Sequence, residues 1–268
     1  MRFPVSRFQK HLEKEMLASV TGKVQETLDL LIKDKQLNHL QEYANIVSIN
    51  RLGYNDHGPV HARMVARNSL DILNLLENKI ETSLEEEKLG TFEDSTILIL
   101  IAGFCHDIGM AMGRKSHERN SIIIGTEIIE NILFKLYDDK NKALIYKAMV
   151  FEAILGHMGD FNVTSIEAGI ILVSDGCDMS KGRARIPYVL QKKPTIGDIH
   201  KYSAMSINKV IIGPGDEERP IKITVDMEDK AGVFQIEEVL YGKVSKSSIK
   251  KYIHIVAQLK DGTELLYL

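Results

Sequence analysis

Histidines and aspartates interrupt apolar segments at separated points of this chain. His61 lies just after the start of a predicted helix, His106 and Asp107 directly follow the apolar segment 97–105, and Asp175 lies in an amphipathic segment. Burying unpaired polar groups costs free energy unless a ligand binds them together, and a divalent cation does so. Two imidazoles and two carboxylates suit Mn, Fe, Mg, Ni or Zn with positions left open for water. The sequence therefore predicts a divalent metal site of the catalytic kind.

The order and local context of these four residues resemble the H…HD…D signature of HD-domain phosphohydrolases. The matching segments are Asp56-His57-Gly58-Pro59-Val60-His61, Gly103-Phe104-Cys105-His106-Asp107-Ile108-Gly109 and Val173-Ser174-Asp175. The resemblance covers roughly residues 51–185. It implies a helical domain whose ligands converge from separate helices onto one metal, with phosphohydrolase activity.

The resemblance also implies a second metal. In binuclear members of the family, histidines in contexts similar to those of His117 and His157 hold a second ion, which the HD aspartate bridges to the first. Carried over, this makes Asp107 the bridge between two ions. The alternative is that both histidines bind substrate phosphate or cap helices. His57 could be a further ligand, but Gly58 and Pro59 after it leave the direction of its ring open. We therefore expect it to lie next to the ligands and not to bind the metal itself.

The chain departs from the family pattern at two points. Many members carry Lys where this chain has Met110, so a charge that contacts phosphate is absent there. No GYP-like sequence follows His157, which reads on as Met158-Gly159-Asp160-Phe161. The main reason to propose a cyclic dinucleotide as substrate is therefore missing.

The implied reaction is hydrolysis of a phosphoester or phosphoanhydride. A metal ion lowers the pKa of its bound water towards neutrality, and the hydroxide attacks phosphorus in line with the leaving group. Asp107 is then a catalytic residue, because it touches the ions. Asp178, one helical turn beyond Asp175, and Asp56 beside His57 are candidate general acids. The alternative for each is to orient a ligand histidine.

Basic residues near the predicted ligands are candidates for substrate binding. Lys181 and Arg183 closely follow Asp175, and Arg114 precedes His117. Arg in particular binds phosphate through paired N–H donors. The alternative for each position is an ordinary charged loop in solvent.

The apolar periodicity predicts a mainly α fold with a small C-terminal α+β domain, and the resemblance implies that the helices form an HD-domain helical bundle. After a helical pattern over 7–49, helices are expected over 59–76, 95–105, 118–137, 142–155 and 165–179. The segment 95–105 is ambiguous between strand and helix, and its helical neighbours favour a helix. Thr164 with Glu167 three residues later predicts a capping box at the last of these helices.

Short β-type runs follow residue 194. Strands are expected over 209–212, 221–226, 252–259 and 264–268, with a helix near 234–241. We divide the chain into an N-terminal helical region (1–50), the HD phosphohydrolase domain (51–200) and the small α+β domain (201–268). Alternating apolar residues predict one buried sheet face, which either pairs subunits in a homodimer or covers the other domain.

Composition limits the partners and the compartment. Lys and Arg total 34 against 37 Asp and Glu, a net charge of −3, which argues against a dedicated nucleic-acid binder. The one lysine-rich cluster is interpreted as solvated surface: Lys243, Lys246, Lys250 and Lys251. Two cysteines without CxxC spacing indicate a reducing compartment. The opening residues lack the apolar stretch of a signal peptide, and 97–105 is too short to cross a membrane, so we expect a cytoplasmic protein without a membrane partner.

These features together predict a metal-dependent phosphohydrolase that acts on a phosphorylated small molecule. The preference for a nucleotide comes from the resemblance, because no base-reading motif is visible. The alternative is a regulatory or binding module on the HD scaffold that acts through its C-terminal α+β domain. Removal of the residues after about 213 should separate the two, since an enzyme of the first kind is expected to keep turnover.

Overall fold

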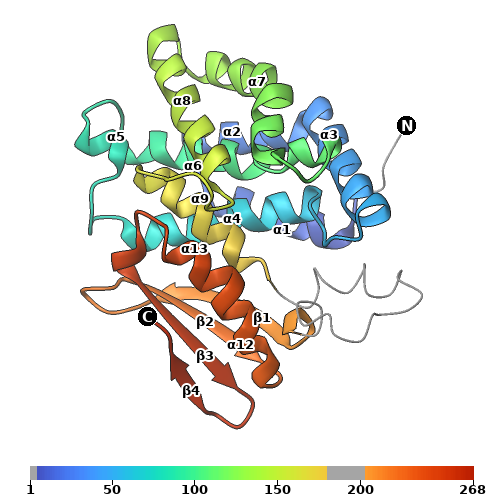
Figure 1. Cartoon of the computed structure of the whole chain (residues 1–268). Helices are drawn as coiled ribbons and strands as arrows, with labels where there is room; N and C mark the ends of the chain where they lie inside the picture. The colour runs from blue at the N-terminus through green and yellow to red at the C-terminus, as the bar shows by residue number, and fades with distance from the viewer. Residues whose placement is uncertain (1–4, 180–202) are drawn as a thin grey trace.

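Helices build the larger part of the fold, and a four-stranded sheet from the C-terminal residues lies against one side of it (Figure 1). The computed structural model describes residues 5–179 and 203–268. This arrangement confirms the predicted class, a mainly helical HD-type fold with a small C-terminal α+β part.

The helical part follows the predicted order closely. Its elements are α1 (Arg7–Ser19), α2 (Gly22–Lys33), α3 (Lys35–Ile46), the π-helical turn η1 (Val47–Arg51), α4 (Pro59–Leu76), α5 (Ser83–Glu86), α6 (Phe92–Cys105), the 3-10 turn η2 (Ile108–Met112), α7 (His117–Leu136), α8 (Lys140–Gly156) and α9 (Ile166–Cys177). The helix predicted over 59–76 is α4, and the ambiguous segment 95–105 lies within α6. The helical pattern over 7–49 is divided by polar caps. Asp34, for example, accepts a bond from Leu37 N at 2.8 Å and starts α3.

The start of α9 differs from the predicted capping box. Ser165 is the N-cap, and its side chain accepts a bond from the first turn. The Thr164 hydroxyl instead donates to Glu152 Oε1 at 2.8 Å. Glu167 accepts a bond from Ser95 Oγ of α6 at 2.7 Å. The prediction was wrong because a tertiary contact between α9 and α6 uses the Glu167 carboxylate.

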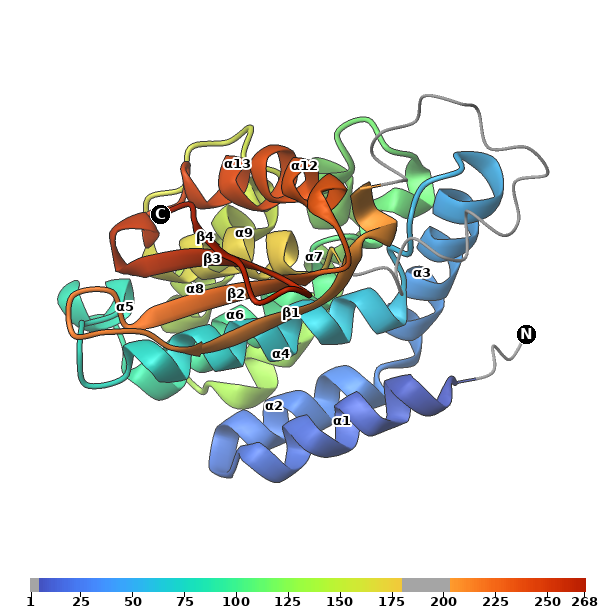
Figure 2. The ribbon, with the colours of Figure 1, turned by 90° about the horizontal axis from the view of Figure 1, so that it is seen from below.

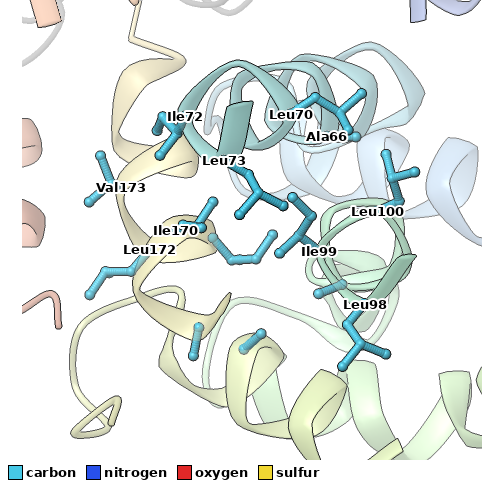
Figure 3. Packing of buried hydrophobic residues seen from close by; sticks show 14 of the residues in the cluster. Ala66, Leu70, Ile72, Leu73, Leu98, Ile99, Leu100, Ile170, Leu172 and Val173 are labelled. Carbon is cyan, nitrogen blue, oxygen red and sulfur yellow. The ribbon is translucent and has the colours of Figure 1, made fainter. Parts of the chain in front are cut away.

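The core lies where α4, α6 and α9 meet. Figure 3 shows Leu73 of α4, Ile99 of α6 and Ile170 of α9 at this junction, and all three are fully buried. Nearly every residue of α6 is buried, so this helix has no polar face. The stretch Phe92–Met112 is long and apolar enough to cross a membrane by composition, but 89% of its apolar window is buried in the fold. It is therefore the central core helix.

A buried arginine fixes the N-terminal helices to this core. Arg63 of α4 donates to Glu13 Oε1 of α1 at 2.9 Å and to Asn38 Oδ1 of α3 at 2.8 Å. It also donates to Gln41, whose Nε2 donates to the carbonyl oxygen of Phe104 at 2.6 Å. A buried charge is tolerated only when it is paired in this way. The network therefore holds α1 and α3 against the end of α6, directly before the predicted metal ligands.

The C-terminal sheet has the order β1-β2-β3-β4. Its strands are β1 (Ile207–Pro214), β2 (Ile221–Met227), β3 (Ile253–Leu259) and β4 (Glu264–Leu266). The middle pair, β2 and β3, is parallel, and the two outer pairs are antiparallel. A parallel pair needs a crossover connection, which here is the helical stretch α12 (Val233–Gln235), η4 (Ile236–Tyr241) and α13 (Gly242–Val244).

The sheet and its crossover cover the helical part. Figure 2 shows β1 beside α4 and the crossover helix beside α9, and both pairs are in contact. Alternate residues of β2 are buried, as the sequence pattern predicted, and they continue the core of the helical part. Of the two roles expected for this face, the structure shows that it covers the other region of the same chain.

Candidate metal centre

The predicted ligands come from the ends of separate helices. His61 lies in the first turn of α4, and Asp175 near the end of α9. His106 and Asp107 follow the end of α6, where the chain turns into η2. The other two are His117, the first residue of α7, and His157, the C-cap of α8. All six side chains are buried, and they converge on the Asp107 carboxylate.

One group forms around Asp107 Oδ2. His61 Nε2 lies 3.2 Å and His106 Nε2 3.3 Å from this oxygen. Asp175 Oδ1 lies 3.0 Å from His61 Nε2 and 3.9 Å from His106 Nε2. The H…HD…D residues predicted from the sequence are therefore brought together in space.

A second group forms around the other oxygen of the same carboxylate. His117 Nε2 lies 3.1 Å and His157 Nε2 3.4 Å from Asp107 Oδ1. Ser116, directly before His117, has φ of +55°, a left-handed conformation that costs free energy in a residue other than glycine. The turn that presents His117 is thus held under strain by its surroundings. Asp107 lies between the two pairs of imidazoles, in the position expected for a bridging ligand.

Hydrogen bonds fix the tautomers of all four imidazoles. The Nδ1 partners are Asp178 Oδ2 at 2.6 Å for His61, Gly103 O at 2.9 Å for His106, Arg114 O at 3.0 Å for His117 and Ile154 O at 2.6 Å for His157. Carbonyl and carboxylate oxygens accept bonds, so each Nδ1 carries the proton and each Nε2 directs a lone pair inward.

The Nε2 lone pairs meet in two facing pairs. His61 and His106 are 3.1 Å apart at Nε2, and His117 and His157 are 3.0 Å apart. Facing lone pairs repel each other unless a cation lies between them. Nitrogen atoms at this separation suit one ion bound at about 2.1 Å from each. The donor set therefore fits a divalent ion in each group, with Asp107 shared by both.

Burial and neighbouring charges set the protonation states that metal binding needs. Burial alone raises the pKa of Asp107, but the adjacent His106 imidazole and other histidines lower it well below its usual range. Burial also raises the pKa of Asp175, while the Lys243 ammonium and His61 lower it more strongly. For His157, burial lowers the pKa to about 4. The carboxylates are therefore anionic and His157 is neutral near pH 7, as ligands must be.

The turn after Asp107 is tightly packed. Gly109 N donates to Ser121 Oγ at 2.8 Å, and this hydroxyl donates to the carbonyl oxygen of His106 at 2.6 Å. A Cβ at Gly109 would lie 2.0 Å from the carbonyl oxygen of His117. Only glycine fits between the turn and α7, so this residue fixes the distance between the two groups of ligands.

The structure separates the two candidate general acids. Asp178 is buried and accepts the bond from His61 Nδ1, so it orients a ligand. Asp56 Oδ1 accepts a bond from Gly58 N at 2.7 Å, which places this carboxylate at the turn before α4 and outside the two groups of ligands. Of the two open roles, the contact of Asp178 favours the orienting one.

A cavity of about 750 Å³ opens onto Asp107 and Asp175. Its walls come from the segment after η1, including Tyr54 and His57, and from Arg114. His57 Nδ1 donates to the carbonyl oxygen of Asn55 at 2.7 Å and lies 2.9 Å from Ser48 Oγ, and its Nε2 lies 3.4 Å from Arg114 Nη1.

The predicted substrate-binding residues have different outcomes. Arg114 lines the cavity. Lys181 and Arg183 lie outside the described residues. The cavity has a further wall from the C-terminal region, which includes Glu238 of the π-helical η4. The π-helical η4 therefore borders the cavity, and the π-helical η1 directly precedes a segment that lines it. Such helical irregularities are frequent at functional sites.

The sequence reasoning missed the contact of a C-terminal lysine with the ligand Asp175. Lys243 of α13 forms an ion pair with Asp175, and its side chain is only 13% exposed. The interpretation of Lys243 as solvated surface was wrong, because the crossover helix directs it into the site. The C-terminal region therefore completes the cavity wall, and the expectation that turnover survives its removal does not agree with this geometry. The local sequence around Lys243 gives no indication that this lysine contacts a residue of the helical part.

Comparison with known proteins agrees with the geometry. The family model of the HD domain matches residues 60–180, which contain all six candidate ligands. The chain is similar to an uncharacterized protein of Methanocaldococcus jannaschii, with 42% identity over 252 residues that cover 94% of this chain and 95% of the relative. No solved structure matches the chain significantly. The sequence match and the converged H…HD…D residues show that this chain belongs to the HD-domain superfamily.

Proposed function

We propose that this protein is a metal-dependent phosphohydrolase that cleaves a phosphoester or phosphoanhydride of a small molecule. The observation that carries this proposal is the position of Asp107, whose two oxygens face two separate pairs of imidazole Nε2 atoms. Family membership supports the general class of reaction.

The side chains of this site prepare it for two divalent ions. His61, His106, Asp107 and Asp175 would hold the first, and Asp107, His117 and His157 the second. Bound ions of this kind supply a hydroxide nucleophile at neutral pH and neutralise the charge of the phosphoryl oxygens.

Positioning is the main task of the protein side chains. Asp178 fixes the ring of His61 through the bond to Nδ1, and three backbone carbonyls fix the rings of the other histidines. Because the ligands are oriented before substrate arrives, little reorganisation is needed during the reaction. Arg114 supplies a guanidinium at the cavity wall that suits a phosphoryl oxygen.

We further propose a nucleotide as the substrate. The cavity has the volume of an ordinary small-molecule site. Tyr54 lines it beside Arg114, whose guanidinium lies 5.7 Å from the centre of the Tyr54 ring. An aromatic face next to a phosphate-binding cation suits a base joined to a phosphate. We place this activity in the cytoplasm, since both cysteines are buried free thiols.

The test combines metal content with turnover. Protein purified without an affinity tag is analysed for transition metals, beside an Asp107→Ala variant and an Asp160→Ala control at an exposed position. We expect one to two metal ions per chain in the wild type and the control, and loss of both metal and activity in Asp107→Ala. The screen offers nucleoside mono-, di- and triphosphates and generic phosphate esters with Mn, Mg, Ni and Fe(II).

Two results would contradict the proposal. Full activity of a metal-free Asp107→Ala sample would show that the site is assigned wrongly. Failure of every metal to bind or to stabilise the wild type would favour the binding-module alternative.

A further inference from the structure

The C-terminal region contributes two lysines to the cavity that contains the metal centre. Lys243 lies in α13, and Lys246 follows one turn later. Both line the cavity, to which the helical part contributes Arg114. The cavity is therefore composite, with cations from two regions that lie more than a hundred residues apart in the sequence.

Lys243 is fixed by two contacts with the helical part. Its Nζ donates to an oxygen of Asp175 and to the carbonyl oxygen of His157 at 2.8 Å. A lysine ammonium has three N–H donors, so these contacts leave one for a ligand in the cavity. The ammonium is thus held directly beside two of the candidate metal ligands.

Two glycines of the helical part leave space for the lysine side chains. A Cβ at Gly176 would lie 3.2 Å from Lys243 Cδ. A Cβ at Gly159 would lie 3.2 Å from Lys246 Cδ and 3.8 Å from its Nζ. Any larger residue at either position would press on a lysine stem. The helical part is therefore shaped to admit both lysines.

The charges around the cavity favour an anionic ligand. Among the described residues that line the cavity, apart from the metal ligands Asp107 and Asp175, the charged ones are three cations and one carboxylate, Glu238. Ions bound to the two aspartates would remove the remaining negative charge. We propose that Lys243 and Lys246 bind the phosphoryl group of the substrate together with Arg114, so that the C-terminal region forms part of the active site. This inference rests on the phosphohydrolase function proposed above and assigns its phosphate-binding residues.

Phosphate binding provides a test that does not depend on turnover. Inorganic phosphate is titrated by calorimetry into the Mn-loaded full-length protein, into Lys243→Met and Lys246→Met, and into Lys251→Met. Lys251 is an exposed lysine of the same region outside the cavity, so its variant is a control for the loss of one positive charge. Because a hydrogen bond to a charged group contributes substantially to binding, we expect the Kd for phosphate to rise about tenfold or more in each cavity variant. The control should bind phosphate like the wild type.

Further measurements separate phosphate binding from a purely structural role. Metal content and the thermal unfolding midpoint are recorded for every variant, and Lys243→Arg is included because it keeps the charge. Phosphate affinity that returns at least in part with Lys243→Arg supports the proposal. Unchanged phosphate affinity in folded, metal-loaded Lys243→Met and Lys246→Met overturns it. If Lys243→Met does not fold, Lys246→Met decides by the same criterion, because Lys246 is exposed and makes no described contact with a metal ligand.

The outcome distinguishes this inference from the proposed function. A wild type that hydrolyses phosphate esters with unchanged kinetics in both lysine variants overturns the inference alone. A wild type that binds phosphate through these lysines but hydrolyses no phosphate compound supports the lysine site and contradicts the proposed function.

Discussion

His61 Nδ1 and Asp178 Oδ2 form a 2.6 Å hydrogen bond between side chains that are 117 residues apart. Both are buried, and Asp178 is the C-cap of α9, the helix that also carries Asp175. One helix end thus supplies both a candidate metal ligand and the group that orients a second ligand on α4. Such carboxylate–histidine pairs fix the tautomer and raise the basicity of the imidazole.

Replacement of Asp178 should weaken metal binding without abolishing it. In Asp178→Asn the anionic acceptor of the His61 proton is lost, so we expect metal affinity to fall about 10- to 100-fold. Isothermal titration with Mn into chelator-treated protein measures this change, with Asp160→Asn as an exposed control. Equal metal affinity in Asp178→Asn and the wild type would show that the hydrogen bond has no such role.

Replacement of His157 should separate the two groups of ligands. His157→Gln removes one imidazole from the group at Asp107 Oδ1 and leaves His61 and His106 untouched. We expect the metal content to fall from two ions per chain to one, with activity reduced by at least about tenfold. Elemental analysis and steady-state kinetics measure both. A wild type with one ion per chain, unchanged in the variant, would contradict the two-metal arrangement.

The metal-free protein should lose stability as the pH falls from about 6.5 to about 4. The folded-state pKa of His157 is lowered to about 4 by burial, below the ordinary value of 6.5. Between these values the unfolded chain binds a proton at this residue and the folded chain does not. The contribution of His157 to stability is therefore complete above pH 6.5 and declines as the pH falls through the window.

Urea unfolding of chelator-treated protein at several pH values measures this effect. His157→Gln is the matched variant, in which this part of the pH dependence should be absent. The prediction is contradicted if, between pH 6.5 and pH 4, the free energy of unfolding falls no more steeply in the wild type than in His157→Gln.

A side chain at Gly109 should disturb the metal centre. In Gly109→Ala the new Cβ would meet backbone atoms of α7, including His117 O at 2.0 Å, which cannot move without shifting that helix. We expect a loss of about 3 kcal/mol in unfolding free energy together with reduced metal content. Gly213→Ala is the control, since a Cβ there has no neighbour within 4 Å. Denaturant unfolding and elemental analysis check both effects, and a Gly109→Ala protein as stable as the control would refute the steric explanation.

Loss of the buried Arg63 should destabilise the fold more than loss of its exposed neighbour Arg67. Arg63→Met leaves Glu13 without its buried partner, and we expect a cost of about 3 kcal/mol. Arg67 lies one turn after Arg63 on α4 and pairs with Glu15 of α1, but both of these side chains are at least 40% exposed. Arg67→Met should therefore cost less than about 1 kcal/mol. Urea unfolding compares the two variants, and similar values would contradict the assigned importance of burial.

The residue types and their local spacing determined much of this protein. Apolar periodicity located α4 and α9 to within a few residues, the helical neighbours of 95–105 favoured α6, and the alternating pattern located the strands. The H…HD…D residues were identified from type, order and context. Local periodicity and short motifs depend on neighbouring residues, so they are visible in the sequence without knowledge of the fold.

Only the tertiary structure decided which distant groups meet. The contact of Lys243 with Asp175, the choice of Asp178 as the partner of His61, and the loss of the Thr164–Glu167 capping box to a contact with α6 all join separate elements. Many partners are available to a buried lysine or carboxylate, and the choice among them depends on how helices and sheet pack. Packing brings together residues that share no spacing along the chain, which is why the ligands were predictable from the sequence, whereas the choice of Asp178 over Asp56 as the orienting group and the contact of Lys243 were not.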